Sequence, residues 1–109
     1  MTDWPETYWA VIFTSKRLPG DDYEYDRVAG RMETLAASIP GYLGIEAVRG
    51  AEGVGITVSY WESEDSIAAW RDHPEHLDAK SRGRRDWYEW YELRVARVDR
   101  ARSFRPGSR

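Results

Sequence analysis

Two apolar, strand-like runs in the middle of the chain are joined by only four residues, and this short connection constrains the fold more than any other feature. The runs are 42–49 (YLGIEAVR) and 54–61 (VGITVSYW), and the connection 50–53 (GAEG) has glycine at both ends. A connection of this length and composition is typical of a hairpin loop. The two runs therefore predict a pair of adjacent antiparallel strands.

The segment before the hairpin predicts one strand and one helix. Residues 8–15 (YWAVIFTS) are aromatic and β-branched and stop at a turn-forming Leu-Pro-Gly, which is typical of a buried strand. From Asp21 to Ile39 apolar residues recur at three- and four-residue spacing, which predicts an amphipathic helix. Pro40 and Gly41 follow and are expected to end it.

The segment after the hairpin predicts two helical pieces and a last strand. Ser63 is placed to cap a short helix that directs Trp70 inward. Pro74 breaks this helix and begins a second one, which is expected to run to about Tyr88. Residues 91–98 then return to strand chemistry.

The resulting order, β-α-β-β-α-α-β, predicts an α+β fold of the ferredoxin-like, split βαβ kind: a four-stranded antiparallel sheet with helices on one face. The first strand nevertheless carries apolar residues on both sides, because Trp9, Val11 and Phe13 alternate with Ala10 and Ile12. A face that the helices leave bare needs a partner. A second copy of the chain would supply it through a two-fold, sheet-to-sheet contact, so we expect a homodimer.

Composition limits the classes of function. A chain of 109 residues fits a single domain over 1–109, with a core of about 8–103. The net charge of −3 gives no general attraction to nucleic acid, and the longest apolar run is far too short to cross a membrane. The absence of cysteine excludes thiolate nucleophiles and disulfides and fits a cytoplasmic protein, and the absence of Asn and Gln excludes side-chain amide chemistry.

The aromatic content is high for so small a domain. Six Trp and seven Tyr exceed what one core of this size needs, so part of this surplus is expected to line an interface or a pocket.

A family resemblance rests on residues 56–63 (ITVSYWES), the following Ile67, Trp70 and His76, and the upstream run 40–44 (PGYLG). These segments resemble the antibiotic biosynthesis monooxygenase family of dimeric α+β barrels, over nearly the whole chain. The resemblance implies a cofactor-independent monooxygenase that binds a flat aromatic or quinone-type molecule. Such substrates pass an electron directly to dioxygen once deprotonated, so no cofactor and no metal are expected.

An enzyme of this kind needs an apolar slot, a group that takes the substrate proton and donors that stabilise the anion. His76 is the candidate base, because histidine has a pKa suited to proton transfer near neutrality. Trp70 is the second candidate catalytic residue, and it forms a pocket wall. The candidate substrate-binding residues are Trp9, Phe13, Tyr60, Arg84 as anion stabiliser and Tyr88 as hydrogen-bond donor.

Each candidate has an ordinary structural interpretation. His76 can be a solvated histidine in a first helical turn, the aromatic residues can form only core and dimer contacts, and Arg84 can belong to a solvated helix face. The alternative function is therefore a noncatalytic dimeric binding or stress-response module. The segment from His73 through Glu75 to His76 could suggest a metal site, because side chains at i and i+3 share a helix face, but a third ligand is not evident.

Haem binding or degradation is a third hypothesis, because the haem-degrading branch of similar proteins would place its tryptophan on Trp70. That branch also implies an Asn on the first strand and a proximal His. In this sequence those positions are Phe13 and Lys80, which counts against haem.

Overall fold

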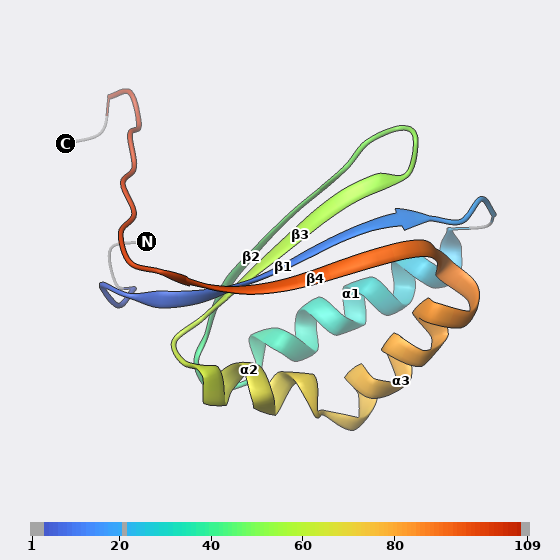
Figure 1. Cartoon of the computed structure of the whole chain (residues 1–109), viewed down its shortest axis with the longest axis horizontal. Coiled ribbons are helices and arrows are strands. Elements are labelled where there is room, and N and C mark those ends of the chain that lie inside the picture. The colour runs from blue at the N-terminus through green and yellow to red at the C-terminus, as the bar shows by residue number, and fades with distance from the viewer. Residues whose placement is uncertain (1–3, 21, 108–109) are drawn as a thin grey trace.

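The computed structural model describes residues 4–20 and 22–107, which form the predicted order of elements. The strands are β1 (Tyr8–Arg17), β2 (Tyr42–Arg49), β3 (Val54–Trp61) and β4 (Tyr88–Val98), and the helices are α1 (Tyr23–Ala37), α2 (Glu64–Arg71) and α3 (Pro74–Arg82). A π-helical turn, η1 (Gly83–Trp87), joins α3 to β4. The strands form one antiparallel sheet in the order β2-β3-β1-β4, and the helices cover one of its faces (Figure 1). The ferredoxin-like α+β fold is confirmed. Asp21, where the first helix was expected to begin, lies outside the described residues.

Local sequence signals set the hairpin and the start of α2. Strands β2 and β3 have the predicted bounds, and Gly53 in their turn has a positive φ of 94°. Ser63 is the N-cap of α2, as predicted, because its hydroxyl accepts a hydrogen bond from the Ser66 amide at 3.2 Å. Gly41 has a φ of 95°, and a Cβ there would lie 1.9 Å from the Ser66 hydroxyl oxygen. Only glycine therefore fits where the chain passes from α1 into β2.

The second helical segment is shorter than predicted. Helix α3 ends at Arg82 and β4 begins at Tyr88, although the sequence predicted a helix to about Tyr88 and a strand from residue 91. The reason is a pairing between distant segments. Arg17 of β1 pairs with Tyr88, and the Leu18 amide donates to the Trp87 carbonyl at 2.8 Å, so the β1–β4 ladder begins earlier than the local pattern indicates.

The core lies between the sheet and the first two helices. Ala36 of α1, Trp61 of β3 and Ile67 of α2 form its buried centre. Partly buried residues pack around this centre: Trp9, Val11, Ile39, Tyr42 and Trp70. Because Trp9 and Trp61 are cross-strand partners, their shared side of the sheet is the side that faces the helices.

The opposite face of the sheet exposes several apolar residues. Val48 is 75% exposed, Val54 and Ile56 are each 43% exposed and Trp90 is 39% exposed, and the strand register places all four on this face. The radius of gyration is 15.0 Å, compared with about 13 Å for a compact domain of this length. The homodimer remains a prediction.

Candidate functional site

His76 lies in the first turn of α3 and is half-buried against Trp70, the penultimate residue of α2. The two rings stack with centroids 4.0 Å apart and an interplanar angle of 12°. The Nδ1 atom of His76 lies 2.9 Å from the Trp70 carbonyl oxygen. Pro74 makes this contact possible because it ends the preceding segment and begins α3, so the chain bends back onto α2.

The contact with Trp70 sets the protonation of His76. A carbonyl oxygen only accepts hydrogen bonds, so Nδ1 carries the proton and Nε2 keeps its lone pair. Burial lowers the pKa of His76 below its usual range, and the hydrogen bond to Trp70 partly opposes this effect. The imidazole is therefore neutral near pH 7 and can accept a proton at Nε2.

The stack continues into the core as a row of four rings, Tyr42–Trp61–Trp70–His76, which we call the ring row. Trp70 stacks on Trp61 at 6.3 Å, and Tyr42 meets Trp61 edge-on at 5.5 Å. Trp61 is fully buried and its Nε1 donates to the Ser59 hydroxyl at 2.9 Å. The middle of the row is therefore fixed at Trp61, while His76 lies at one end of it.

An apolar wall extends from the core along β1 and β4 on the same side of the sheet. Val11 packs against the core, and its cross-strand partner in β4 is Val95, while Phe13 pairs with Leu93. Leu93 is 55% exposed and Val95 is 47% exposed, so the helices leave this part of the sheet open. A flat apolar molecule would find a wall here that continues into the core packed against Trp70.

Phe13 and Tyr88 belong to a second aromatic cluster near the start of β4. Phe13 lies 5.3 Å from Tyr88 and 5.2 Å from Tyr91, between ring centroids. The Tyr88 hydroxyl donates to the hydroxyl of Tyr25 at 3.1 Å, and Arg49 donates to that same Tyr25 oxygen at 3.3 Å. Burial, followed by the bond to Tyr25, raises the pKa of Tyr88. The proton of Tyr88 is thus engaged inside the protein.

The remaining candidates lie elsewhere. Tyr60 is on the opposite face of the sheet, where its ring packs against Trp4 and Tyr8 and its hydroxyl donates to Glu46 at 2.6 Å. This bond, more than burial, raises the pKa of Tyr60 to about 12. Arg84 is exposed in η1.

The structure therefore brings together one part of the predicted site. Trp70 and His76 stack, and Trp9 packs against the same core as Trp70. Eleven residues of α3 and η1 separate His76 from Tyr88, which corresponds to a distance of roughly 18 Å at about 1.5 Å per residue. Sequence reasoning missed the structural role of Tyr25, although a tyrosine at an inward helical position was a usable signal.

The histidine pair has a structural use. His73 caps α3 by accepting the Glu75 amide at its Nδ1, at 3.2 Å. Within residues 4–20 and 22–107 no group of three or more His, Asp or Glu side chains is arranged to hold a metal ion.

Phe13 packs between tyrosines at the strand position where the haem-degrading branch would have Asn. No helix in the described part of the chain is long and apolar enough to cross a membrane.

Comparison with known proteins places this geometry in a family. The fold defines a ferredoxin-like α+β domain. The family model for antibiotic biosynthesis monooxygenase matches residues 11–82. An uncharacterised protein of Bacillus subtilis, YqjZ, is 56% identical over 97 residues, which cover 89% of this chain and 84% of that protein. The chain therefore belongs to the antibiotic biosynthesis monooxygenase family.

Three further proteins extend the comparison. The jasmonate monooxygenase ABM of Pyricularia oryzae is 32% identical over 94 residues, covering 83% of this chain but 43% of that protein. The solved structure of SnoaB, a cofactor-independent oxygenase from Streptomyces nogalater, has a TM-score of 0.69 and 17% identity. It covers 94% of this chain and 99% of that one. A protein from Shewanella oneidensis has a TM-score of 0.74 at 5% identity, covering 86% of this chain and 93% of that one. These two structures support the fold alone.

Proposed function

We propose that this protein is a cofactor-independent monooxygenase that takes a flat aromatic or quinone-type substrate on the helix-facing side of its sheet. The observation that carries the proposal is the state of His76, because the bond from its Nδ1 to the Trp70 carbonyl leaves Nε2 free to accept a proton. The half-exposed wall of Leu93 and Val95 supports an apolar substrate. The jasmonate monooxygenase among its relatives supports oxygenase chemistry.

The reaction that fits a single base is the oxidation of an activated ring methylene to a carbonyl. His76 would take a proton from R₂CH₂, and the carbanion would pass one electron to O₂ and combine with it to give R₂CH–OO⁻. Protonation to R₂CH–OOH and loss of water then give R₂C=O, so the balance is R₂CH₂ + O₂ → R₂C=O + H₂O. The substrate supplies all the electrons. The protein would contribute the base and an apolar surface that excludes water.

We also propose that the working form is a homodimer joined through the exposed sheet face. Four half-exposed or more exposed apolar residues on that face support this: Val48, Val54, Ile56 and Trp90. Sheets that pack face to face bury such residues in a shared core about 10 Å thick. Sedimentation at micromolar concentration should show a dimer.

Oxygen uptake with a polycyclic anthrone-type substrate tests the activity. The wild type should consume one O₂ per carbonyl formed, and His76→Gln should lose most of this activity. His73→Asn is the matched control, because Asn preserves the N-cap of α3 while removing the other imidazole. Full activity in His76→Gln would refute the proposed base.

A binding module without turnover is the second candidate. The close stack of His76 on Trp70 favours it, since a purely structural histidine would show the same geometry. A thermal-shift screen separates the two, because a ligand that binds the native state raises the apparent melting temperature. An aromatic ligand that raises it in the wild type and in His76→Gln, without oxygen uptake, would support the module.

A further inference from the structure

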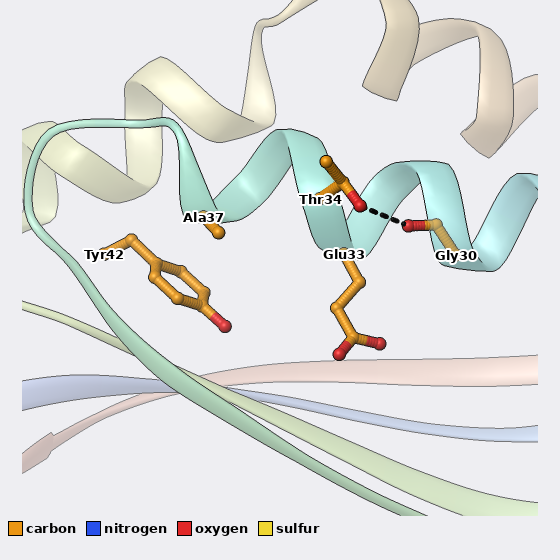
Figure 2. Close-up of a pocket in the computed structure, with 5 residues that line it drawn as sticks. All are labelled: Gly30, Glu33, Thr34, Ala37 and Tyr42. Carbon is orange, nitrogen blue, oxygen red and sulfur yellow. Dashed lines mark hydrogen bonds between the residues drawn. The ribbon is translucent and has the colours of Figure 1, made fainter.

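A cleft of about 540 Å³ lies between α1 and the start of β2, and neither Trp70 nor His76 lines it. Gly30, Glu33, Thr34 and Ala37 form one face of α1 at helical spacing, and Tyr42 closes the cleft from β2. Figure 2 shows the Glu33 carboxylate and the Tyr42 hydroxyl pointing into the space between α1 and the sheet. Two small residues keep the cleft open, because Gly30 and Ala37 project little or no side chain into it.

The polar groups of this cleft are not neutralised within the chain. Glu33 and the Tyr42 hydroxyl make no ion pair or hydrogen bond in the described part of the chain, whereas the Thr34 hydroxyl donates to the Gly30 carbonyl at 3.1 Å. Burial, and to a lesser degree the negative charge of Glu33, raises the pKa of Tyr42. A carboxylate beside a neutral phenol oxygen is suited to a guanidinium, which donates several hydrogen bonds in one plane.

The chain carries matching cations on an extended segment. Residues 99–107, which we call the arm, follow β4 and are exposed throughout. Phe104 is 85% exposed, and Arg100, Arg102 and Arg105 make no ion pair with any residue of 4–20 or 22–107. In Figure 1 the arm leaves the sheet on the side opposite the helices. That is the side on which the proposed second copy packs.

Two-fold symmetry brings the arm of one copy near the cleft of the other. In the proposed dimer, an axis that runs along the strands, between two facing sheets, would place β4 of one copy over β2 of its partner without exchanging the strand ends. Tyr42 and the root of the arm lie at the same end of the sheet, because Tyr42 pairs with Trp61, and Trp9 pairs with both Trp61 and Arg97. The sheets are about 10 Å apart. The arm therefore starts above the partner's β2 edge.

The length of the arm decides which of its arginines can reach the cleft of the other copy. At about 3.3 Å per extended residue, Arg102 and Arg105 lie about 13 and 23 Å of chain beyond Val98, while Arg100 lies only about 7 Å beyond it. The path must cross the gap between the sheets and pass the β2 edge to reach the helix side. Arg100 is too close to the sheet for this path, whereas the other two arginines reach.

We propose that the arm of each copy passes around the β2 edge of the other copy and that the guanidinium of Arg102 or Arg105 binds Glu33 and Tyr42 in its cleft. The inference rests on the proposed homodimer and identifies an interaction surface in addition to the sheet face. Because Tyr42 is the first member of the ring row, the docked arm contacts the same row of rings that ends at His76.

Charge reversal in the full-length chain tests the proposal. Glu33→Arg should weaken the dimer roughly tenfold or more, and Arg102→Glu with Arg105→Glu should weaken it similarly, as expected for loss of a charge-assisted pair. Combining all three changes should restore a substantial part of the affinity. Glu52→Arg, at the opposite end of the hairpin, and Arg100→Glu are the matched controls, and both should leave the dimer near its wild-type affinity. Analytical ultracentrifugation measures each dissociation constant.

A second variant distinguishes loss of the arm contact from misfolding of the chain. A Cβ at Gly30 would meet no atom within 4 Å, and replacing a helical glycine favours the helix, so Gly30→Leu should fold while filling the cleft. It should weaken the dimer without lowering the melting temperature of the monomer. Unchanged dimer affinity in Glu33→Arg and Gly30→Leu would overturn the arm contact while leaving the dimer itself in place. A monomeric wild type would overturn the dimer and this contact together, whereas oxygen uptake tests the catalytic proposal separately.

Discussion

Helices α1 and α3 lie on the same side of the sheet but are held there by different forces. Helix α1 buries Val28, Leu35 and Ala36, whereas none of the nine residues of α3, all of which are described, is buried. Helix α3 is tied to α1 by ion pairs. Arg31 donates to both carboxylate oxygens of Glu75 at 2.9 and 2.7 Å, and Arg82 donates to Glu24 at 2.7 Å.

The difference matters because His76 is on α3. Burial of apolar surface responds weakly to salt and pH, while exposed ion pairs are screened and titrate. The protein thus places its candidate base on the helix whose attachment depends more on solution conditions. The stack of His76 on Trp70 is a contact of α3 that is not ionic.

The largest expected effect comes from making the same truncation in both helices. Leu35 is 9% exposed and Leu77 is 45% exposed. Leu35→Ala should lower the free energy of unfolding by about 2–5 kcal/mol because it leaves a cavity, while Leu77→Ala should lower it by less than about 1 kcal/mol. Urea denaturation measures both. Equal losses would show that α3 is packed as tightly as α1.

Acid should weaken both ion pairs of Glu24, the one with Arg27 within α1 and the one with Arg82 that connects α1 to α3. Bonds from Arg27 and then Arg82 lower the pKa of Glu24 to about 2 from 4.5. Because the folded form holds this carboxylate ionised, its contribution is present above pH 4.5 and is lost as the pH falls toward 2. The stability difference between wild type and Glu24→Gln should therefore shrink across this range, measured from denaturation midpoints. A constant difference would mean that the ion pairs contribute nothing.

A smaller dependence on pH is expected from His76. Its pKa is lowered by burial, so below the ordinary histidine value of 6.5 the unfolded chain binds the proton more tightly than the folded chain does. The free energy of unfolding should therefore fall as the pH drops from 6.5 to the folded pKa. His76→Gln should remove this part of the pH dependence, and His73→Asn should retain it. If both variants keep the wild-type slope, His76 is not the titrating group.

The smallest effect on global stability is expected from Arg31→Gln, which should instead loosen α3 locally. Arg31→Gln removes the bidentate pair to Glu75, and both side chains are about half exposed, so the midpoint of unfolding should hardly change. Hydrogen exchange of the α3 amides should nevertheless become faster, and raised salt should do the same to the wild type. The α1 amides serve as the internal control. Faster exchange in both helices alike would contradict separate attachment.

Local chemistry made most of the fold predictable from the sequence. The glycine-bounded hairpin, the Ser63 cap and the Pro74 start of α3 each depend on neighbouring residues, and each was confirmed. The end of α3 was not predictable in this way. It depends on the pairing of Arg17 with Tyr88, which are 71 positions apart in the sequence.

The predicted substrate-binding residues came from both faces of the sheet, because aromatic character by itself does not reveal which face a residue occupies. Tyr60 and Trp61 are neighbours on one strand, so they point to opposite faces, and alternation alone was enough to separate them. The separation of Tyr88 from His76 follows from the length of the helical segment between them. The stack of His76 on Trp70 required the bend at Pro74, which no spacing rule specifies.

The ring row also has an optical consequence. Indole emission is quenched by a protonated imidazole in contact with it, and His76 lies flat on Trp70 at 4.0 Å. Trp70 fluorescence should therefore dim as His76 takes up its proton, and this dimming should be absent in His76→Gln. The protein thus contains its own indicator for the charge on the candidate base, readable in the absence of any substrate.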